Sequence, residues 1–168
     1  MASLVVIDYG SQYTRLITRR LRELQVFSVI ETPDVTPARL RELDARGVVL
    51  SGGPQSVYGE RAPQLPAGLL DAGLPILAIC YGMQLLARVL GGEVVPSPVR
   101  EYGKAVLTSY GGALFDGVEG EFVAWMSHGD SVERPPSGFV VTASTSDTPV
   151  AAMEDVARHW YGLQFHPE

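Results

Sequence analysis

Cys80 is the residue whose type and surroundings point most directly to chemistry. It follows the apolar run 75–79 and precedes Tyr81, Gly82 and a helical pattern. A nucleophile on such a strand-to-helix turn projects above the sheet, as in the G-x-S-x-G elbow of hydrolases, and the helix start favours the reactive thiolate. The pattern here is A-x-C-x-G, with Ala78 at the first glycine position. The context indicates a thiol nucleophile, while a cysteine in an apolar run is equally typical of an inert core residue.

Two turns could supply the hydrogen-bond donors that such a nucleophile needs. A thiolate that attacks an amide carbonyl creates an oxyanion, which backbone N–H groups can stabilise. Tyr81, directly after the nucleophile, offers one such group. Gly52-Gly53 follows another apolar run and offers the second, although a simple turn before Pro54 is an alternative interpretation. We predict that the two turns meet at one edge of a sheet.

Three histidines could protonate the leaving amine: His128, His159 and His166. Their positions in the chain cannot decide among them, because the partner of a nucleophile is near in space and not in sequence. His166 has the best local case, since it ends a strand-like run and the carboxylate of Glu168 could orient its ring as in a Cys-His-acid triad. His128 lies in SHGD, which we predict to be a loop after the strand EFVAWM. A structural role stays open for each histidine, and their spacing predicts no metal site.

Short apolar runs alternate with amphipathic stretches in the first half of the chain. We predict strands at 4–8, 26–30, 47–51 and 75–79, and helices at 12–25, from 36 onwards and at 83–90. Thr36-Pro37 has the composition of an N-cap and a first helical residue, and Gly91-Gly92 ends the last helix. This alternation predicts an α/β fold: a doubly wound, mainly parallel sheet with helices on both faces and a ligand site beyond the carboxyl ends of the strands.

After residue 92 the pattern changes to strands without clear helices between them. We predict these strands at 104–110, 121–126, 138–144, 150–153 and 159–165. Proline and glycine turns such as Pro135-Pro136 separate them, which favours antiparallel or mixed pairing. The segment 54–66 is the longest predicted loop, and it leaves the predicted site edge.

The bulk composition limits the possible classes. A chain of 168 residues with 46% hydrophobic residues can bury one core, so we expect a single domain spanning 1–168. A net charge of −6 and basic residues spread along the chain argue against nucleic-acid binding. One cysteine allows no intramolecular disulfide, which fits a reducing compartment. Without a leader-like segment or a long apolar run, we expect a cytoplasmic protein that does not bind membranes.

Six motifs carry a resemblance to a known family. DYGSQYT, LSGGPQSVY, ICYGMQLLA, REYGKA, WMSHGD and GLQFHPE occur in this order. Together they closely resemble the amidotransferase domain of GMP synthases, from residue 5 to residue 168. CYGMQ and FHPE are specific to class I glutamine amidotransferases, whereas DYGSQYT, REYG and WMSHGD indicate the GMP synthase branch. The resemblance implies the flavodoxin-like fold of the class I amidotransferases.

The resemblance implies catalytic roles for five residues. Cys80 would attack the side-chain carboxamide of glutamine and form a glutamyl thioester. His166 would act as general base and acid, with Glu168 orienting its ring. The backbone amides of Gly53 and Tyr81 would form the oxyanion hole.

The resemblance also implies a substrate-binding surface. Gln84, one helical turn after the nucleophile, and the segment of Ser127, His128, Gly129 and Asp130 would surround the α-amino and α-carboxylate groups of L-glutamine. In that interpretation His128 belongs to the binding loop and is not the catalytic base.

The expected partner is a synthetase. The ammonia would pass to an ATP-pyrophosphatase domain or subunit that aminates XMP to GMP. ATP and Mg²⁺ would bind to that partner, and we expect no cofactor in this domain, because SGGPQS lacks the lysine of a phosphate loop. Family domains normally continue beyond the HPE motif, so we expect the chain to be a trimmed piece without its synthetase domain.

Two departures from the family pattern leave alternatives open. The methyl group of Ala78 could shift the nucleophile, and Glu168 is the last residue, where a terminus is expected to fray. A partner-dependent or non-catalytic binding module is therefore one alternative. Another thiol hydrolase of similar fold is a second, although the presence of both HPE and SHGD argues against it.

Overall fold

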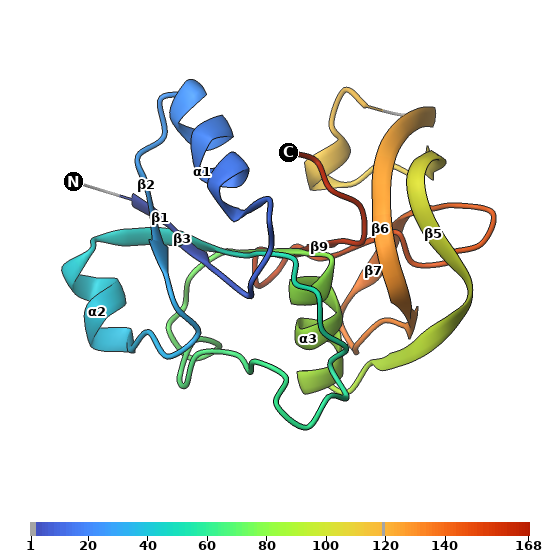
Figure 1. Cartoon of the computed structure of the whole chain (residues 1–168). Helices are drawn as coiled ribbons and strands as arrows, with labels where there is room; N and C mark the ends of the chain where they lie inside the picture. The colour runs from blue at the N-terminus through green and yellow to red at the C-terminus, as the bar shows by residue number, and fades with distance from the viewer. Residues whose placement is uncertain (1–2, 119) are drawn as a thin grey trace.

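Nine strands form one mixed sheet (Figure 1). The computed structural model describes residues 3–118 and 120–168, so residues 1, 2 and 119 of the predicted 1–168 domain lie outside the described residues. The strand order is β2-β1-β3-β4-β9-β8-β7-β5-β6. The first five strands in this order pair in parallel, and the pairs beyond β9 are antiparallel. The predicted α/β fold with a mixed sheet is confirmed.

The parallel strands are short and largely buried. They are β1 (Ser3–Ile7), β2 (Ser28–Glu31), β3 (Ala45–Leu50), β4 (Ile76–Ile79) and β9 (Trp160–Leu163). In β1, Val5 and Val6 are fully buried and belong to different core clusters. Val5 shares its cluster with Met83, whereas Val6 packs with Ile17. Burial on both faces is typical of apolar strands in a parallel sheet.

Helices cover both faces of this parallel part. The helices are α1 (Thr14–Glu23), α2 (Pro37–Glu42) and α3 (Tyr81–Val89). α1 contributes to the core cluster on one face, and α2 and α3 contribute to the cluster on the other. The predicted N-cap of α2 is confirmed, because the Thr36 hydroxyl accepts a hydrogen bond from the backbone N–H of Arg39. The bounds of these helices and strands lie within two residues of the predicted ones. For α2 only the start was predicted.

The antiparallel part differs more from its prediction. It consists of β5 (Glu93–Ser109), β6 (Gly120–Arg134), β7 (Val140–Ser144) and β8 (Ala152–Asp155). The predicted start of β5 at 104 and end of β6 at 126 are wrong, since both strands are much longer. They pair with each other along most of their length, and this pairing extends strand structure into segments whose local composition does not favour it.

The predicted loop around His128 is therefore also wrong. Residues 127–130 lie inside β6, and His128 pairs with Glu101 of β5. Glycine and polar residues indicated a loop, but the partner strand satisfies the backbone of this segment. The register is irregular between Pro96 and Glu101, so the ladder shifts just before it reaches His128.

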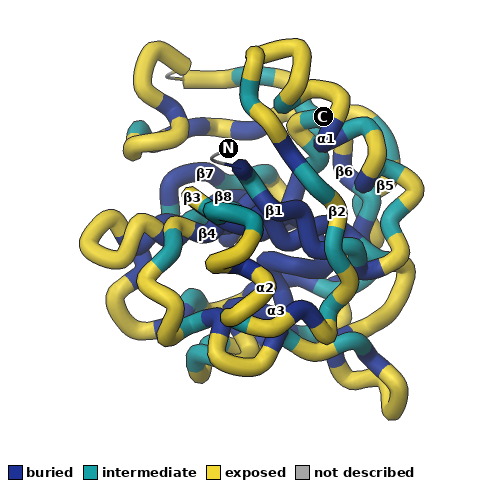
Figure 2. The backbone as a smooth tube through the Cα atoms, turned by 90° about the vertical axis from the view of Figure 1, so that its left-hand side faces the viewer, coloured by how far each residue is buried: buried dark blue, intermediate teal, exposed yellow. Residues whose placement is uncertain are grey.

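The burial pattern separates the strands from the connections (Figure 2). Buried stretches gather in central strands such as β1 and β8, and exposed loops surround them. The predicted loop 54–66 contains no helix or strand. Within the described residues, no helix has the length and apolar character needed to cross a bilayer.

The last residues of the chain run between α1 and β6 (Figure 1). The backbone N–H of His166 donates to the carbonyl oxygen of Trp125 in β6 at 2.9 Å. On the other side, the Arg20 side chain of α1 donates to the carbonyl oxygen of Glu168 at 3.4 Å. These contacts place His166 beside the carboxyl end of β4, where it lines the same cavity as Cys80.

Candidate active site

Cys80 occupies a strained turn between β4 and α3. Its backbone has φ 51° and ψ −108°, a combination that a residue with a side chain adopts only at a cost of about 1–3 kcal/mol. Its N–H donates to the carbonyl of Leu163 at 2.7 Å, and its own carbonyl accepts from Gln84 N–H at 3.1 Å. A Cβ on Gly82 would lie 2.6 Å from the carbonyl oxygen of Leu50, so only glycine allows the helix to begin this close to β3. Such a turn holds the side chain above the sheet edge, as an elbow requires.

The methyl group of Ala78 has room in this elbow. Ala78 is fully buried in β4, and its register partner in β9 is Gly162. A Cβ on Gly162 would lie 2.9 Å from the side chain of Met83. Gly162 thus leaves space beside Ala78 in the neighbouring strand. The turn at Cys80 therefore forms with alanine in place of glycine.

His166 and Glu168 form a buried pair beside the nucleophile. The Nδ1 atom of His166 lies 3.0 Å from a carboxylate oxygen of Glu168, and the two side chains are only 8% and 4% exposed. Burial lowers the pKa of His166, but hydrogen bonds and charge attraction to Cys80 and Glu168 outweigh it and raise the pKa from 6.5 to about 9. This raised pKa favours the protonated ring at neutral pH. The structure brings the three predicted triad residues together.

The second oxygen of the Glu168 carboxylate is buried without a hydrogen-bond partner among the described residues. It lies at a small cavity that Tyr13, Leu16, Trp125 and His166 also line. The Tyr13 ring stands 5.0 Å from the His166 ring. The acidic residue of the triad is thus held by one hydrogen bond to the histidine and by aromatic surroundings.

The two predicted oxyanion turns meet beside Cys80. A Cβ on Gly53 would come within 2.6 Å of the carbonyl oxygen of Tyr9, and one on Gly52 would lie 3.1 Å from the His166 ring and 3.6 Å from Cβ of Cys80. A side chain at Gly53 would clash with backbone, and one at Gly52 would crowd the His166 ring. In the part of the chain that the structure describes, the backbone N–H groups of Gly53 and Tyr81 donate to no protein acceptor. Both amides are available to a ligand.

The predicted substrate-binding residues line a cavity of about 360 Å³ next to the nucleophile. Its walls include Cys80, Gln84 and the segment 127–130. The Gln84 side chain donates to the carbonyl oxygen of Asp130 at 2.8 Å, which ties α3 to β6. The Cys80 sulfur lies 3.5 Å from the carbonyl oxygen of Ser127, so the same β6 segment also contacts the nucleophile. A cavity of this size fits a small polar molecule.

The His128 side chain is bound into the protein and does not serve as a base for Cys80. Its Nδ1 lies 2.9 Å from the carbonyl oxygen of Asp130, and its Nε2 lies 3.1 Å from the carboxylate of Glu101. Thr145 and Thr148 donate hydroxyl hydrogen bonds to the same carboxylate. Both ring nitrogens of His128 are thus engaged by groups of the protein, and neither is left for Cys80.

Glu101 therefore supports the binding segment, and the sequence did not reveal it. It belongs to the motif REYGKA, which was recognisable only as a family motif without a role for this residue. The third histidine, His159, follows Val156 in the turn before β9 and lines none of the cavities at Cys80.

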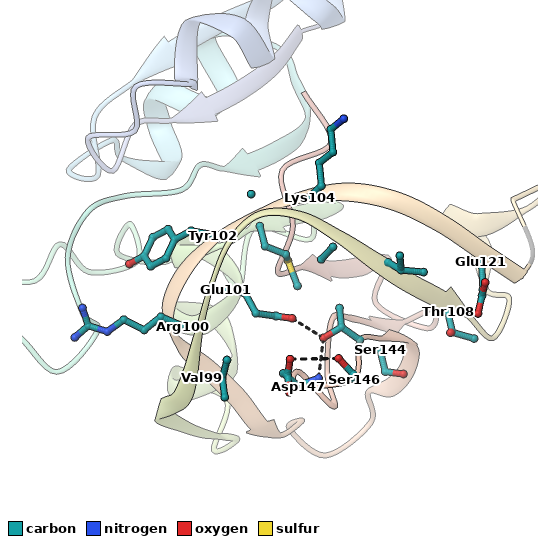
Figure 3. Close-up of a pocket in the computed structure, with 15 residues that line it drawn as sticks. Val99, Arg100, Glu101, Tyr102, Lys104, Thr108, Glu121, Ser144, Ser146 and Asp147 are labelled. Atoms are coloured by element: carbon teal, nitrogen blue, oxygen red, sulfur yellow. Dashed lines mark hydrogen bonds between the residues drawn. The ribbon is translucent and has the colours of Figure 1, made fainter.

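A second, larger cavity lies along β5, and Cys80 does not line it (Figure 3). It measures about 730 Å³ and lies between β5 and the segment 144–147. Glu101 points toward this segment, whereas Arg100 and Tyr102 project from the opposite side of the strand and also line the cavity at Cys80. No group of three or more His, Cys, Asp or Glu side chains among the described residues is placed to hold a metal ion.

Comparison with known families agrees with this site. The sequence model of the family described as Glutamine amidotransferase class-I matches residues 5–168. The chain belongs to this family. The class I amidotransferase assignment covers the elbow, both glycine turns and the His166–Glu168 pair.

Curated relatives of this amidotransferase are GMP synthases. The chain is 51% identical over 166 residues to GMP synthase [glutamine-hydrolyzing] of Geobacillus kaustophilus, which covers 98% of this chain and 32% of that relative. It is 51% identical over 164 residues to the enzyme of the same name from Thermus thermophilus, covering 98% and 33%. The chain thus spans about a third of the length of these relatives.

Solved structures share the amidotransferase fold. A Thermoplasma acidophilum protein, provisionally assigned as one of the subunits of a GMP synthase, superposes with a TM-score of 0.86 at 31% identity, over 99% of this chain and 84% of that one. A glutamine amidotransferase from Thermotoga maritima superposes with a TM-score of 0.79 at 20% identity, over 98% and 75%, which indicates a common fold only.

Proposed function

We propose that this chain is the glutaminase part of a GMP synthase. It hydrolyses L-glutamine to glutamate and ammonia through a glutamyl thioester on Cys80. The observation that supports the proposal is the junction at Cys80, where a strained elbow, the Gly53 turn and the His166–Glu168 pair meet at one cavity. The choice of the GMP synthase branch of the amidotransferases rests on the curated relatives, which are named GMP synthases.

Thioester formation begins with the Cys80 thiolate. The sulfur attacks the side-chain carbonyl carbon of glutamine, and the carbonyl oxygen becomes an oxyanion between the N–H groups of Gly53 and Tyr81. When the tetrahedral intermediate collapses, the carbon–nitrogen bond breaks and the amide nitrogen takes a proton from the His166 imidazolium. Ammonia leaves, and the acyl group stays on the sulfur. The raised pKa of His166, about 9, supports this acid role at neutral pH.

Hydrolysis of the thioester returns the enzyme to its starting state. The His166 ring, now neutral, removes a proton from a water molecule, and the resulting hydroxide attacks the thioester carbon. The carbon–sulfur bond then breaks, glutamate leaves and Cys80 regains its negative charge beside the imidazolium. Glu168 keeps the ring oriented through both steps, because its carboxylate accepts from Nδ1 and leaves Nε2 for the reacting atoms.

The polar wall of the cavity at Cys80 is the proposed binding surface for the rest of glutamine. Gln84 and the residues Ser127, His128, Gly129 and Asp130 surround the α-amino and α-carboxylate groups. In this arrangement His128 acts through its hold on the Asp130 backbone, since its ring is already bonded on both sides. The wall's position next to the sulfur supports this role.

The ammonia is delivered to a synthetase domain or subunit that aminates XMP to GMP. Support comes from the relatives, of which this chain spans about a third. ATP and Mg²⁺ bind to that synthetase, because the loop SGGPQS at this site lacks the lysine of a phosphate-binding loop. This chain needs no cofactor of its own, and the reaction takes place in the cytoplasm.

Labelling with a glutamine-mimicking diazo-ketone tests the proposal. Intact-mass measurement of the chain, with and without excess glutamine, should detect one adduct on Cys80 that glutamine suppresses. The variant His166→Ala serves as a matched control and should label far more slowly. If Cys80 resists the analogue while a generic alkylating reagent modifies it readily, the thiol is accessible but no glutamine site exists in this chain, and the proposed function fails.

A further inference from the structure

Gln164 is a completely buried polar residue that lies beside the nucleophile. Its backbone N–H donates to the carbonyl oxygen of Ala151, and its side-chain amide nitrogen lies 3.6 Å from the sulfur of Cys80. It is two residues before His166, in the motif GLQFHPE. The proposed mechanism does not use this side chain, although its amide nitrogen lies about as near the sulfur as the carbonyl oxygen of Ser127 does.

A backbone carbonyl fixes which way this amide points. The Asp130 carbonyl oxygen can only accept, so the Gln84 atom at 2.8 Å from it must be the amide nitrogen. The same nitrogen lies 3.2 Å from the side-chain oxygen of Gln164. The Gln164 oxygen therefore faces Gln84, and its NH₂ group faces Cys80. If the Gln164 amide were flipped, its NH₂ group would face the NH₂ group of Gln84. Its oxygen would then face the sulfur.

We infer that the Gln164 carboxamide donates a hydrogen bond to the Cys80 thiolate and so acts as a catalytic residue in glutamine hydrolysis. The catalytic part of this inference rests on the proposed function. A buried donor aimed at an ionisable group favours its charged form, because the thiolate accepts this bond more strongly than the neutral thiol. The bond supplements the effect of the protonated His166 on the sulfur.

The side-chain amides of Gln84 and Gln164 also connect the cavity wall at Asp130 to Cys80. Both hydrogens of the Gln84 amide are used, one by Asp130 and one by Gln164, so its oxygen is the atom available to a ligand in the cavity. Hydrogen bonds in such a chain polarise one another. A donor on the substrate that bonds to the Gln84 oxygen therefore strengthens the chain of bonds that ends at Cys80.

Two substitutions at Gln164 test the inference. Gln164→Met keeps the approximate length and removes the donor, whereas Gln164→Glu keeps the shape and puts carboxylate oxygens at the sulfur. Gln64→Met is the matched control, because Gln64 lies in the 54–66 loop and bonds only to the nearby carbonyl of Ala62. The readouts are the rate of Cys80 alkylation by iodoacetamide as a function of pH, and kcat and KM for glutamine.

The expected result is an upward shift of the alkylation midpoint by about one pH unit in Gln164→Met, and a larger shift in Gln164→Glu. For glutamine hydrolysis, kcat should fall about tenfold in Gln164→Met with KM within about twofold. Gln64→Met should match the wild type in both readouts. A purely structural role for Gln164 would leave the alkylation midpoint of Gln164→Met in place.

An unchanged midpoint in a Gln164→Met chain that still unfolds cooperatively overturns the inference. If Gln164→Met does not fold, Gln164→Leu decides, because leucine also lacks a donor and carries no charge, and an unchanged midpoint there has the same meaning. Because alkylation does not involve glutamine, it is independent of the proposed activity. A wild-type chain that hydrolyses no glutamine, yet shows the midpoint shift on substitution, supports thiolate stabilisation by Gln164 and contradicts the proposed function.

Discussion

The two parts of the sheet contribute different components to the candidate site. The parallel part provides the reacting groups, with Cys80 directly after β4 and His166 shortly after β9. The antiparallel part provides the segment 127–130, which forms the wall of the cavity. Helices and buried strands enclose the parallel part on both faces, whereas the β5–β6 pair exposes large side chains such as Val106 and Val123.

The two parts are also held by different forces. The elbow at Cys80 stays in a strained conformation because tightly packed backbone surrounds it, as the contact of Gly82 with Leu50 demonstrates. The wall in β6 is held instead by polar side chains, such as the pair of His128 and Glu101. Changes in the parallel part should therefore act mainly on kcat, and changes that loosen the wall should act mainly on KM.

Loss of the nucleophile should have the largest effect. Cys80→Ala removes the atom that bonds to substrate, so glutamine hydrolysis should fall by at least about 10⁴-fold. The substitution deletes one atom and should leave cooperative unfolding intact, as measured by thermal denaturation. Turnover equal to wild type in this variant would refute the thioester mechanism.

Cys80→Gly separates the strain from the chemistry. It is equally inactive, but glycine adopts φ 51° without the steric cost of a side chain. Cys80→Gly should therefore be more stable than Cys80→Ala by about 1 kcal/mol in urea unfolding. Equal stability of the two variants would mean that the turn at Cys80 stores no strain.

Crowding of the oxyanion turn should have the next largest effect. The methyl group in Gly53→Ala would meet the Tyr9 carbonyl oxygen at 2.6 Å, so the turn must move and carry its N–H away from the oxyanion position. Loss of one such donor typically lowers kcat about 10²–10³-fold. Gly73→Ala is a control for backbone strain alone, because alanine is strained at φ 67° while its Cβ meets no atom within 4 Å. Steady-state glutaminase assays measure both, and an unchanged kcat in Gly53→Ala would remove Gly53 from the proposed oxyanion hole.

Titration of His166 should produce a more gradual loss. The ring acts as an acid while protonated, and its pKa is raised to about 9, so kcat should fall roughly tenfold per pH unit above that value. Because the folded protein binds this proton more tightly than the unfolded chain does, the associated stability is present below about pH 6.5 and disappears as the pH rises to about 9. The pH dependence of kcat and of the unfolding free energy can be measured on one sample series.

The contribution of Cys80 to this titration can be isolated. Cys80→Ala removes the hydrogen bond and the charge that the thiolate provides, so the His166 midpoint in an NMR titration should move down from about 9 toward 6.5. His159→Gln simplifies the spectrum without altering a residue of the site. A His166 midpoint unchanged by Cys80→Ala would contradict the imidazolium–thiolate pair.

The parallel part was the more predictable from sequence because local patterns determine it. Apolar runs, the cap at Thr36 and the glycine turns give its elements to within two residues, and the elbow context singled out Cys80. His166 and Glu168 are neighbours in the chain, so their pairing was also visible. The roles of these residues in glutamine hydrolysis stay predictions until they are measured.

The antiparallel part depends on contacts between residues far apart in the chain. Glu101 and His128 are 27 positions apart, and only the pairing of β5 with β6 brings them together and turns a loop-like segment into strand. Gln164 and Cys80 are 84 positions apart and meet through the packing of β9 against β4. The one sequence signal for these residues is a polar side chain inside an otherwise apolar or recognised motif, which indicates a buried role without naming its partner.

Weakening the hydrogen bonds that hold the segment 127–130 should have the smallest effect on glutamine hydrolysis. It should change KM and not kcat. In Glu101→Gln, one carboxylate oxygen becomes an NH₂ group, so the side chain can no longer accept from His128, Thr145 and Thr148 together. His128 then holds the Asp130 carbonyl less firmly, and that carbonyl also accepts from Gln84. We expect KM for glutamine to rise about fivefold, with kcat within about twofold.

Glu121→Gln is the matched control for this change. Glu121 is an exposed acid of β6 that lines the larger cavity of Figure 3 and not the cavity at Cys80. The same loss of charge there should leave both kinetic constants unchanged. A fall in kcat at constant KM in Glu101→Gln would mean that the wall positions the reacting groups as well as the substrate. In that case the division of roles between the two parts of the sheet would be wrong, because the Gln84–Gln164 amide chain would carry a disturbance of β6 directly to Cys80.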